Sequence, residues 1–180
     1  DVTSADVEYI MYSFHDVAGY QKFGSYEGNQ TLNTDNVVDF GFKADFVMIK
    51  NLDEGGSQWM ILDSKRENGK AIYGNTNAAE SDYTGDILLT SQGLRFGSTN
   101  INVNKASRTY VYMAFAKNVP SNTTLANSFN AVFYAGSSTS RAISNFGFRP
   151  DLVWIKKLSA TDLHVLTDSV RGTNKQLFSN

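Results

Sequence analysis

The strongest constraint on this chain is an internal repeat. The segment FGFKADFVMIK (residues 40–50) returns as FGFRPDLVWIK (residues 146–156), and nearly every position keeps its chemical type at an offset of 106 residues. Three further matches follow, at offsets between 101 and 108: YIMYSF (9–14) with YVYMAF (110–115), YEG (26–28) with YAG (134–136), and DSKR (63–66) with DSVR (168–171). Four matches of this kind predict tandem units of about 105 residues that differ by loop insertions.

The match of residues 9–14 to residues 110–115 sets the expected boundaries, because the second of these segments closes a unit. We expect the closing strand of a preceding unit in residues 1–19, a complete unit in 20–118, a linker in 119–128, and the first half of a second, incomplete unit in 129–180. A sheet that lacks its closing strand has an exposed edge, and exposed edges pair with other chains. We therefore expect self-association in which residues 1–18 of one copy close the 129–180 unit of a neighbour. The alternative is that the sequence is an excerpt of a longer repeat protein.

Short apolar segments separated by turns predict strands and no long helix. Residues 46–49 form an apolar run of buried-strand length, and the Gly-rich residues 53–57 join it to a second strand at 58–63 as a hairpin. No segment shows a 3.6-residue apolar stripe longer than two turns. We expect an all-β fold, β-sandwich or jelly-roll-like, with a barrel as the alternative. The other expected strands are 86–90 with 93–96, 108–116, and 152–155 with 163–166.

Composition excludes several classes of protein. The 16 basic residues are scattered through a chain of net charge −2, so a nucleic-acid partner is not expected. The chain has no cysteine, which excludes a disulfide scaffold and a thiolate zinc site. No run approaches the roughly 18 apolar residues of a membrane span, so membrane insertion is not expected either.

We expect no catalytic residue, and therefore no enzyme. The two histidines, His15 and His164, have no cysteine partner, no metal-ligand spacing and no nucleophile elbow around them. Asp63 and Asp168 hold equivalent repeat positions, which favours a structural role such as a salt bridge to Arg66 or Arg171 over the paired acids of a glycosidase.

No cofactor or metal is expected, although calcium stays open as an alternative. Residues 53–57 and 81–86 place oxygen ligands in loops, but neither loop has EF-hand spacing.

Aromatic residues make up 13% of the chain, and loop aromatics can stack on sugar faces. Tyr20, Tyr73 and Tyr83 lie in polar, turn-rich surroundings and are the predicted glycan-binding residues. Trp59 and Trp154 lie inside strand patterns, so we expect both in the core.

One series of motifs resembles a known family. It runs HDVAGYQKFGSYEGN (15–29), GFKADFVMIK (41–50), Trp59, DSKR (63–66) and YVYMAFA (110–116). The series resembles a repeated domain of uncharacterised function in virion structural proteins, such as tail, fibre or capsid-associated proteins, of marine and other tailed bacteriophages. The resemblance covers essentially the whole chain. Two departures are that Pro150 replaces Ala44, and that Leu163 or His164 stands opposite Trp59. The resemblance implies a location on a virion, and it assigns neither an activity nor a role to any residue.

Repeat, composition and resemblance together predict a non-enzymatic phage virion structural protein. It would be a tail, fibre or capsid-surface module for assembly, host-surface adhesion, or both. Its expected partners are other copies of itself, other virion proteins and cell-surface glycans. The alternative is a secreted or cell-surface carbohydrate-binding module or adhesin of a bacterium, assembling by strand exchange. A polysaccharide depolymerase is a third alternative, which requires an acidic cleft.

Overall fold

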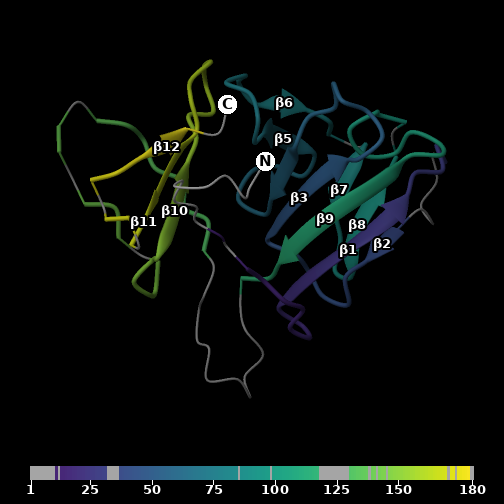
Figure 1. The fold of residues 1–180 in the computed structure, drawn as a ribbon, viewed down its shortest axis with the longest axis horizontal. Coiled ribbons are helices and arrows are strands. Elements are labelled where there is room, and N and C mark those ends of the chain that lie inside the picture. The colour runs from purple at the N-terminus through teal and green to yellow at the C-terminus, as the bar shows by residue number, and fades with distance from the viewer. Residues whose placement is uncertain are drawn as a thin grey trace, which may run out of the picture.

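A computed structural model describes most of the chain. The described residues are 11, 13–31, 37–84, 86–97, 99–117, 130–137, 139–140, 142–144, 146–169, 171–172 and 174–178. Regular structure in these residues consists of twelve β-strands (Figure 1), so the predicted all-β, sandwich-like fold is confirmed. The described residues contain no helix long and apolar enough to cross a membrane. The expected linker, 119–128, and most of the expected closing strand in 1–19 lie outside the described residues.

The largest sheet has six antiparallel strands in the order β1-β9-β3-β4-β5-β6. The long strand β9 pairs with β1 on one side and with β3 on the other, so that Phe115 lies opposite both Gln21 of β1 and Phe46 of β3. β9 therefore joins the start of the unit, β1, to its middle, β3. The bounds are β1 (Gln21–Glu27), β3 (Phe46–Asn51), β4 (Met60–Asp63), β5 (Lys70–Tyr73), β6 (Ser81–Asp82) and β9 (Thr109–Phe115).

A second sheet covers one face of the first. It contains β2 (Val37–Asp39), β7 (Ile87–Leu89) and β8 (Gly93–Phe96) in the order β2-β8-β7. The predicted hairpin of 86–90 with 93–96 is confirmed as β7 and β8. Gly93 is required there, because a Cβ at this position would lie 2.0 Å from the Val38 carbonyl oxygen of the neighbouring strand.

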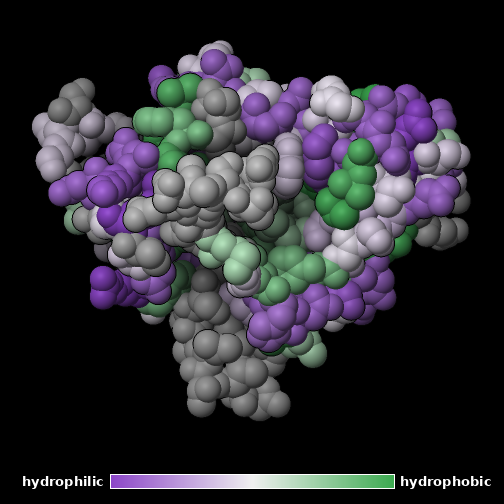
Figure 2. Space-filling model, viewed as in Figure 1, coloured by the Kyte–Doolittle hydropathy of each residue, from purple (hydrophilic) through white to green (hydrophobic). Residues whose placement is uncertain are grey.

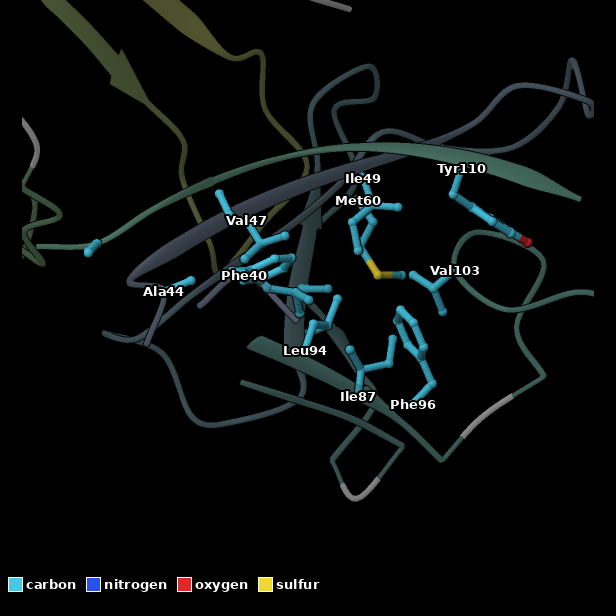
Figure 3. Close-up of a cluster of buried hydrophobic side chains, with 14 of the residues drawn as sticks. Phe40, Ala44, Val47, Ile49, Met60, Ile87, Leu94, Phe96, Val103 and Tyr110 are labelled. Carbon is cyan, nitrogen blue, oxygen red and sulfur yellow. The ribbon is translucent and has the colours of Figure 1, made fainter. Parts of the chain in front are cut away.

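The core lies between these two sheets, as Figure 3 shows. Val47 and Ile49 of β3 point into it because they are two residues apart, and side chains alternate between the faces of a strand. Ile87, Leu94 and Phe96 face them from the smaller sheet. This arrangement is a two-layer sandwich whose core is completed by loop residues such as Phe40 and Val103.

A third sheet lies to one side of the sandwich, on the left in Figure 1. It contains β10 (Leu152–Ile155), β11 (Val165–Asp168) and β12 (Leu177–Phe178) in that order. The prediction of a strand over residues 163–166 is wrong by two residues, since β11 begins at Val165. The reason is that Asp162, just before this segment, binds the sandwich instead of β10: its amide donates to the Asn77 carbonyl at 2.8 Å.

The third sheet has the same order and register as β3-β4-β5, at an offset of 105 or 106 residues. Ile61 pairs with Ile72 in the sandwich, and Leu166 pairs with Leu177 in the third sheet. The backbone before each sheet also agrees, because Gly41 and Gly147 have φ angles of 77° and 81°. Such angles favour glycine. These correspondences support the tandem units, which stay a prediction.

Candidate functional site

The outer face of β3, β4 and β5 is where the third sheet meets the sandwich. Met48, Ile61 and Ile72 point away from the main core and form a separate buried cluster. Trp154 of β10 and Leu158 cover this cluster. The junction is therefore an apolar contact between two parts of the chain that are about a hundred residues apart in sequence.

Hydrogen bonds fix the same junction. The Glu80 amide donates to the Leu158 carbonyl at 3.2 Å. The Asn77 carbonyl accepts from the Asp162 amide at 2.8 Å and from Lys156 Nζ at 3.1 Å. Directional bonds of this kind set the orientation of the third sheet, which apolar packing alone leaves open.

A pocket of about 260 Å³ opens beside this junction. Its lining residues are Met48, Trp59, Gly74, Asn75 and Trp154. The Trp59 amide donates to Asn75 Oδ1 at 2.8 Å, and the Gly74 amide donates to the Trp59 carbonyl at 2.8 Å. These bonds hold Trp59 beside the start of β4, where its side chain is 41% exposed. One indole ring is thus presented to solvent by a rigid backbone.

The second indole, Trp154, is held by its neighbours. Its Nε1 donates to His164 Nδ1 at 2.8 Å, and the two rings meet edge-on at 5.6 Å. A Cβ at Gly74 would lie 3.3 Å from Trp154 Cη2, so the glycine lets the indole approach the backbone closely. A ring fixed on both sides is preorganised for binding, because a ligand does not have to immobilise it.

His164 is fully buried beneath Trp154. Burial lowers the pKa of its imidazole, and the nearby Lys156 ammonium acts in the same direction. Since Nδ1 accepts the indole proton, the neutral ring carries its own proton on Nε2. His164 therefore serves as a neutral support for Trp154.

The pocket has side chains that can bind a ligand, but its lining residues include no group for acid–base chemistry. Its five lining residues include two indoles, a thioether and an amide, and no acid, histidine or hydroxyl. Indole faces favour apolar C–H surfaces, and the exposed Asn75 amide offers a hydrogen bond at the rim. Among the described residues, no group of three or more acids or histidines could hold a metal ion.

The predicted glycan-binding tyrosines lie elsewhere. Tyr20 and Tyr73 are buried in the main core, and Tyr83 packs against it half-buried. The Tyr73 and Tyr83 hydroxyls hydrogen-bond to each other, and burial raises the pKa of Tyr73 to about 12. The expectation of exposed tyrosine rings is therefore wrong for Tyr20 and Tyr73, because turn-rich sequence around them does not keep large aromatics out of the core.

The expectation that both tryptophans lie in the core is also wrong. Trp59 is exposed and Trp154 is half-buried at the junction. Alternation within a strand shows which residues share a face, but it does not show whether another layer covers that face. Asn75 and Met48 were missed because the pocket gathers residues that lie as much as 106 positions apart, as Met48 and Trp154 do.

The carboxylates have the structural role expected of them. Asp63 Oδ2 lies 2.6 Å from Arg66 Nη2, and Asp168 Oδ2 lies 2.5 Å from Arg171 Nε. In the first calcium candidate, residues 53–57, the Glu54 carboxylate already binds Lys105 and Arg108, each at 2.9 Å. Both cations bind Glu54 Oε1, so this carboxylate already has partners for its charge.

Comparison with known proteins gives a family and no activity. A family model described as a domain of unknown function (DUF7483) matches residues 1–119 and 125–180. No curated protein matches the chain, and no solved structure does.

Proposed function

We propose, from the premise that this chain belongs to the DUF7483 family of unknown function, that it is a non-enzymatic structural module of a phage virion surface that adheres to glycans. The observation that carries the adhesion is the pocket between Trp59 and Trp154. The location on a virion is supported by the motif series described above.

The chemistry of the pocket suits a sugar ring. Pyranose rings present apolar C–H faces with hydroxyls at the edges. Trp59 offers an exposed indole face, and Asn75 lies beside it to bind a hydroxyl. At about 260 Å³ the pocket is smaller than the roughly 300–1,000 Å³ of sites for larger ligands, so we expect it to hold one terminal sugar residue.

Glycan-array screening followed by titration calorimetry tests the adhesion. We expect the Trp59→Ala variant to lose about tenfold or more in affinity for any glycan that the chain binds, which corresponds to about 1.4 kcal/mol. The matched control is Leu52→Ala, which removes a large apolar side chain that is also exposed but lies outside the pocket and outside the third sheet. Equal affinities of the chain and the Trp59→Ala variant would contradict the proposed site, and so would a chain that binds no glycan at all.

Peptide mass spectrometry across a density gradient of source material tests the location. Peptides of this chain that peak with DNA-filled particles would support a virion protein. Peptides confined to a DNA-free soluble fraction would instead favour a secreted bacterial carbohydrate-binding module or adhesin, which would use the same pocket. A depolymerase would release reducing sugar, and the pocket offers no acid for that reaction.

A further inference from the structure

The two equivalent strands β3 and β10 differ in what lies beside them. β3 pairs with β4 on one side and with β9 on the other. β10 pairs with β11 on the equivalent first side. On its second side, no strand among the described residues pairs with it. The edge of β10 therefore presents backbone donors and acceptors where β3 has a partner.

The lack of a β9-like strand beside β10 in the described part of the chain also accounts for a second difference. Among the strands that the structure describes, β1 pairs with β9 alone. Its counterpart, at an offset of 108, covers residues 129–135, and the described part of that segment adopts no strand. Tyr26 of β1 is half-buried and stacks on Tyr110 of β9 at 5.0 Å, whereas its counterpart Tyr134 is exposed. Both differences follow if the third sheet lacks only a strand of the β9 type.

Apolar side chains are exposed around this edge. Leu152 and Ile155 lie on β10 itself, and Figure 2 shows a further apolar area where Figure 1 places β12, at the opposite edge of the same sheet. The exposed large apolar residues of this part of the chain are Phe133, Tyr134, Leu152, Ile155, Leu163, Leu177 and Phe178. Exposed apolar area next to an open sheet edge is typical of a site that another chain covers.

We propose that the edge of β10 binds an antiparallel strand of the β9 type, and that its occupant is residues 9–14 of a second copy of this chain. The motif YIMYSF at residues 9–14 matches YVYMAF at 110–115, which is the β9 sequence that covers β3. The proposal deepens the assembly part of the proposed function and is independent of glycan binding.

The β3–β9 register transfers directly to this pairing. Phe46 lies opposite Phe115, and Val47 opposite Ala114. At offsets of 106 and 101 residues, these pairs become Leu152 with Phe14, and Val153 with Ser13. The small residue again faces valine on the core side, and Phe14 again faces an apolar residue on the outer side.

The far end of the paired strand agrees as well. Asn51 lies opposite Tyr110, so the transferred register places Tyr9 opposite Lys157. There Tyr9 would stack on Tyr134, as Tyr110 stacks on Tyr26. Phe14 packs on Phe23 and Phe115 of its own sandwich, which would anchor the donated strand at its base.

This interface is head-to-tail, since the donating segment and the accepting edge are different surfaces. Heterologous contacts of this kind form open filaments or closed rings, and two copies that exchange the segment reciprocally form the smallest ring, a dimer. We therefore expect light scattering after gel filtration to show a mass that increases with concentration from one copy to two or more, and a fixed monomer would contradict this.

Engineered cysteines test the register, and the chain has no native cysteine to interfere. Directly opposite residues in an antiparallel pair have Cα atoms about 4.5–5.5 Å apart, within disulfide range. We expect an equimolar mixture of the single variants Ser13→Cys and Val153→Cys to form a disulfide-linked heterodimer under mild oxidation. Because each chain then carries one cysteine, this product can only be intermolecular.

The matched control moves one cysteine along the same face. In a mixture of Ser13→Cys with Ile155→Cys, the side chains would be diagonal neighbours about 7–8 Å apart, and we expect little heterodimer. Equal cross-linking in the two mixtures would overturn the register.

A double variant that carries both Ser13→Cys and Val153→Cys tests which copy supplies the strand. If it cross-links only within one chain, the proposal that a second copy occupies the edge of β10 is overturned. If the Ser13→Cys and Val153→Cys variants still cross-link when each also carries Trp59→Ala, assembly stands even if glycan binding fails.

Discussion

The sandwich and the third sheet contain the same local structure in two different environments. Ile49 of β3 is 0% exposed, whereas its counterpart Ile155 of β10 is 37% exposed. Tyr73 of β5 is 9% exposed, and its counterpart Phe178 of β12 is 53% exposed. Strand pairing and register are therefore set by the local sequence, while burial is set by whether a second layer and a closing strand are present.

The polar contacts of the two regions agree more closely than the apolar ones. Ser64 Oγ donates to Asp45 at 2.5 Å, and Ser169 Oγ donates to Asp151 at 2.7 Å. These contacts join adjacent strand ends, so they need no second layer. The hairpin and its Ser–Asp hydrogen bond are therefore the same whether or not the apolar faces are covered.

The largest difference between the two regions is expected at the equivalent isoleucines. Ile49→Ala should lower the free energy of unfolding by about 3–4 kcal/mol, because it removes buried methylenes and leaves a cavity. Ile155→Ala should cost less than about 1 kcal/mol in the isolated chain, because its side chain already contacts water. Urea unfolding of both variants at low protein concentration measures this. Equal costs would show that β10 is covered in solution.

The equivalent ion pairs should differ next. Asp63→Ala leaves the Arg66 guanidinium, whose side chain is 2% exposed, with Glu80 at 3.8 Å as its remaining acid, so we expect a loss of about 3 kcal/mol. Asp168→Ala leaves Arg171, whose side chain is 20% exposed, so a smaller loss of about 1 kcal/mol is expected. Both losses are read from urea midpoints.

A double variant provides the control for the first ion pair. Asp63→Ala combined with Arg66→Met removes the uncompensated buried charge and should recover most of the lost stability. If the double variant is as unstable as Asp63→Ala alone, then backbone contacts made by Asp63 account for the loss. Two such contacts are visible, since Asp63 Oδ1 accepts from the amides of Lys65 and Arg66.

The smallest effect concerns His164, which occupies the position equivalent to Trp59. Because burial lowers its pKa in the folded chain, the unfolded chain binds the proton more readily below about pH 6.5. Stability is therefore retained above that pH and falls as pH drops below it, by at most about 1.4 kcal/mol per pH unit. Thermal melts between pH 7 and pH 5 measure the fall.

The matched variant for this effect is His164→Asn. The Asn Oδ1 atom can still accept the Trp154 indole proton, but the side chain does not titrate. We expect its melting temperature to change less between pH 7 and pH 5 than that of the unmodified chain. An unchanged pH dependence would assign the effect to other groups.

Much of the fold was predictable, and the pocket was not. The strands that contain residues 46–49 and 93–96 could be predicted because apolar runs and neighbouring turn residues are local signals in the sequence. The start of β4 was predicted at Gln58 and lies at Met60, because the amides of Gln58 and Trp59 bind the side chains of Asn102 and Asn75. Those partners are distant in sequence, and so are the residues that gather around the pocket.

The junction built by Trp154 and Leu158 has a consequence for any longer array of such units. Each unit would place its strand equivalent to β3 against the outer face of the preceding sheet through the same contacts. One fixed rotation and translation applied repeatedly traces a helix, and nearest-neighbour contacts make its stiffness a property of the single junction. The pitch of such a fibre would be encoded in a few hydrogen bonds to Asn77 and Glu80.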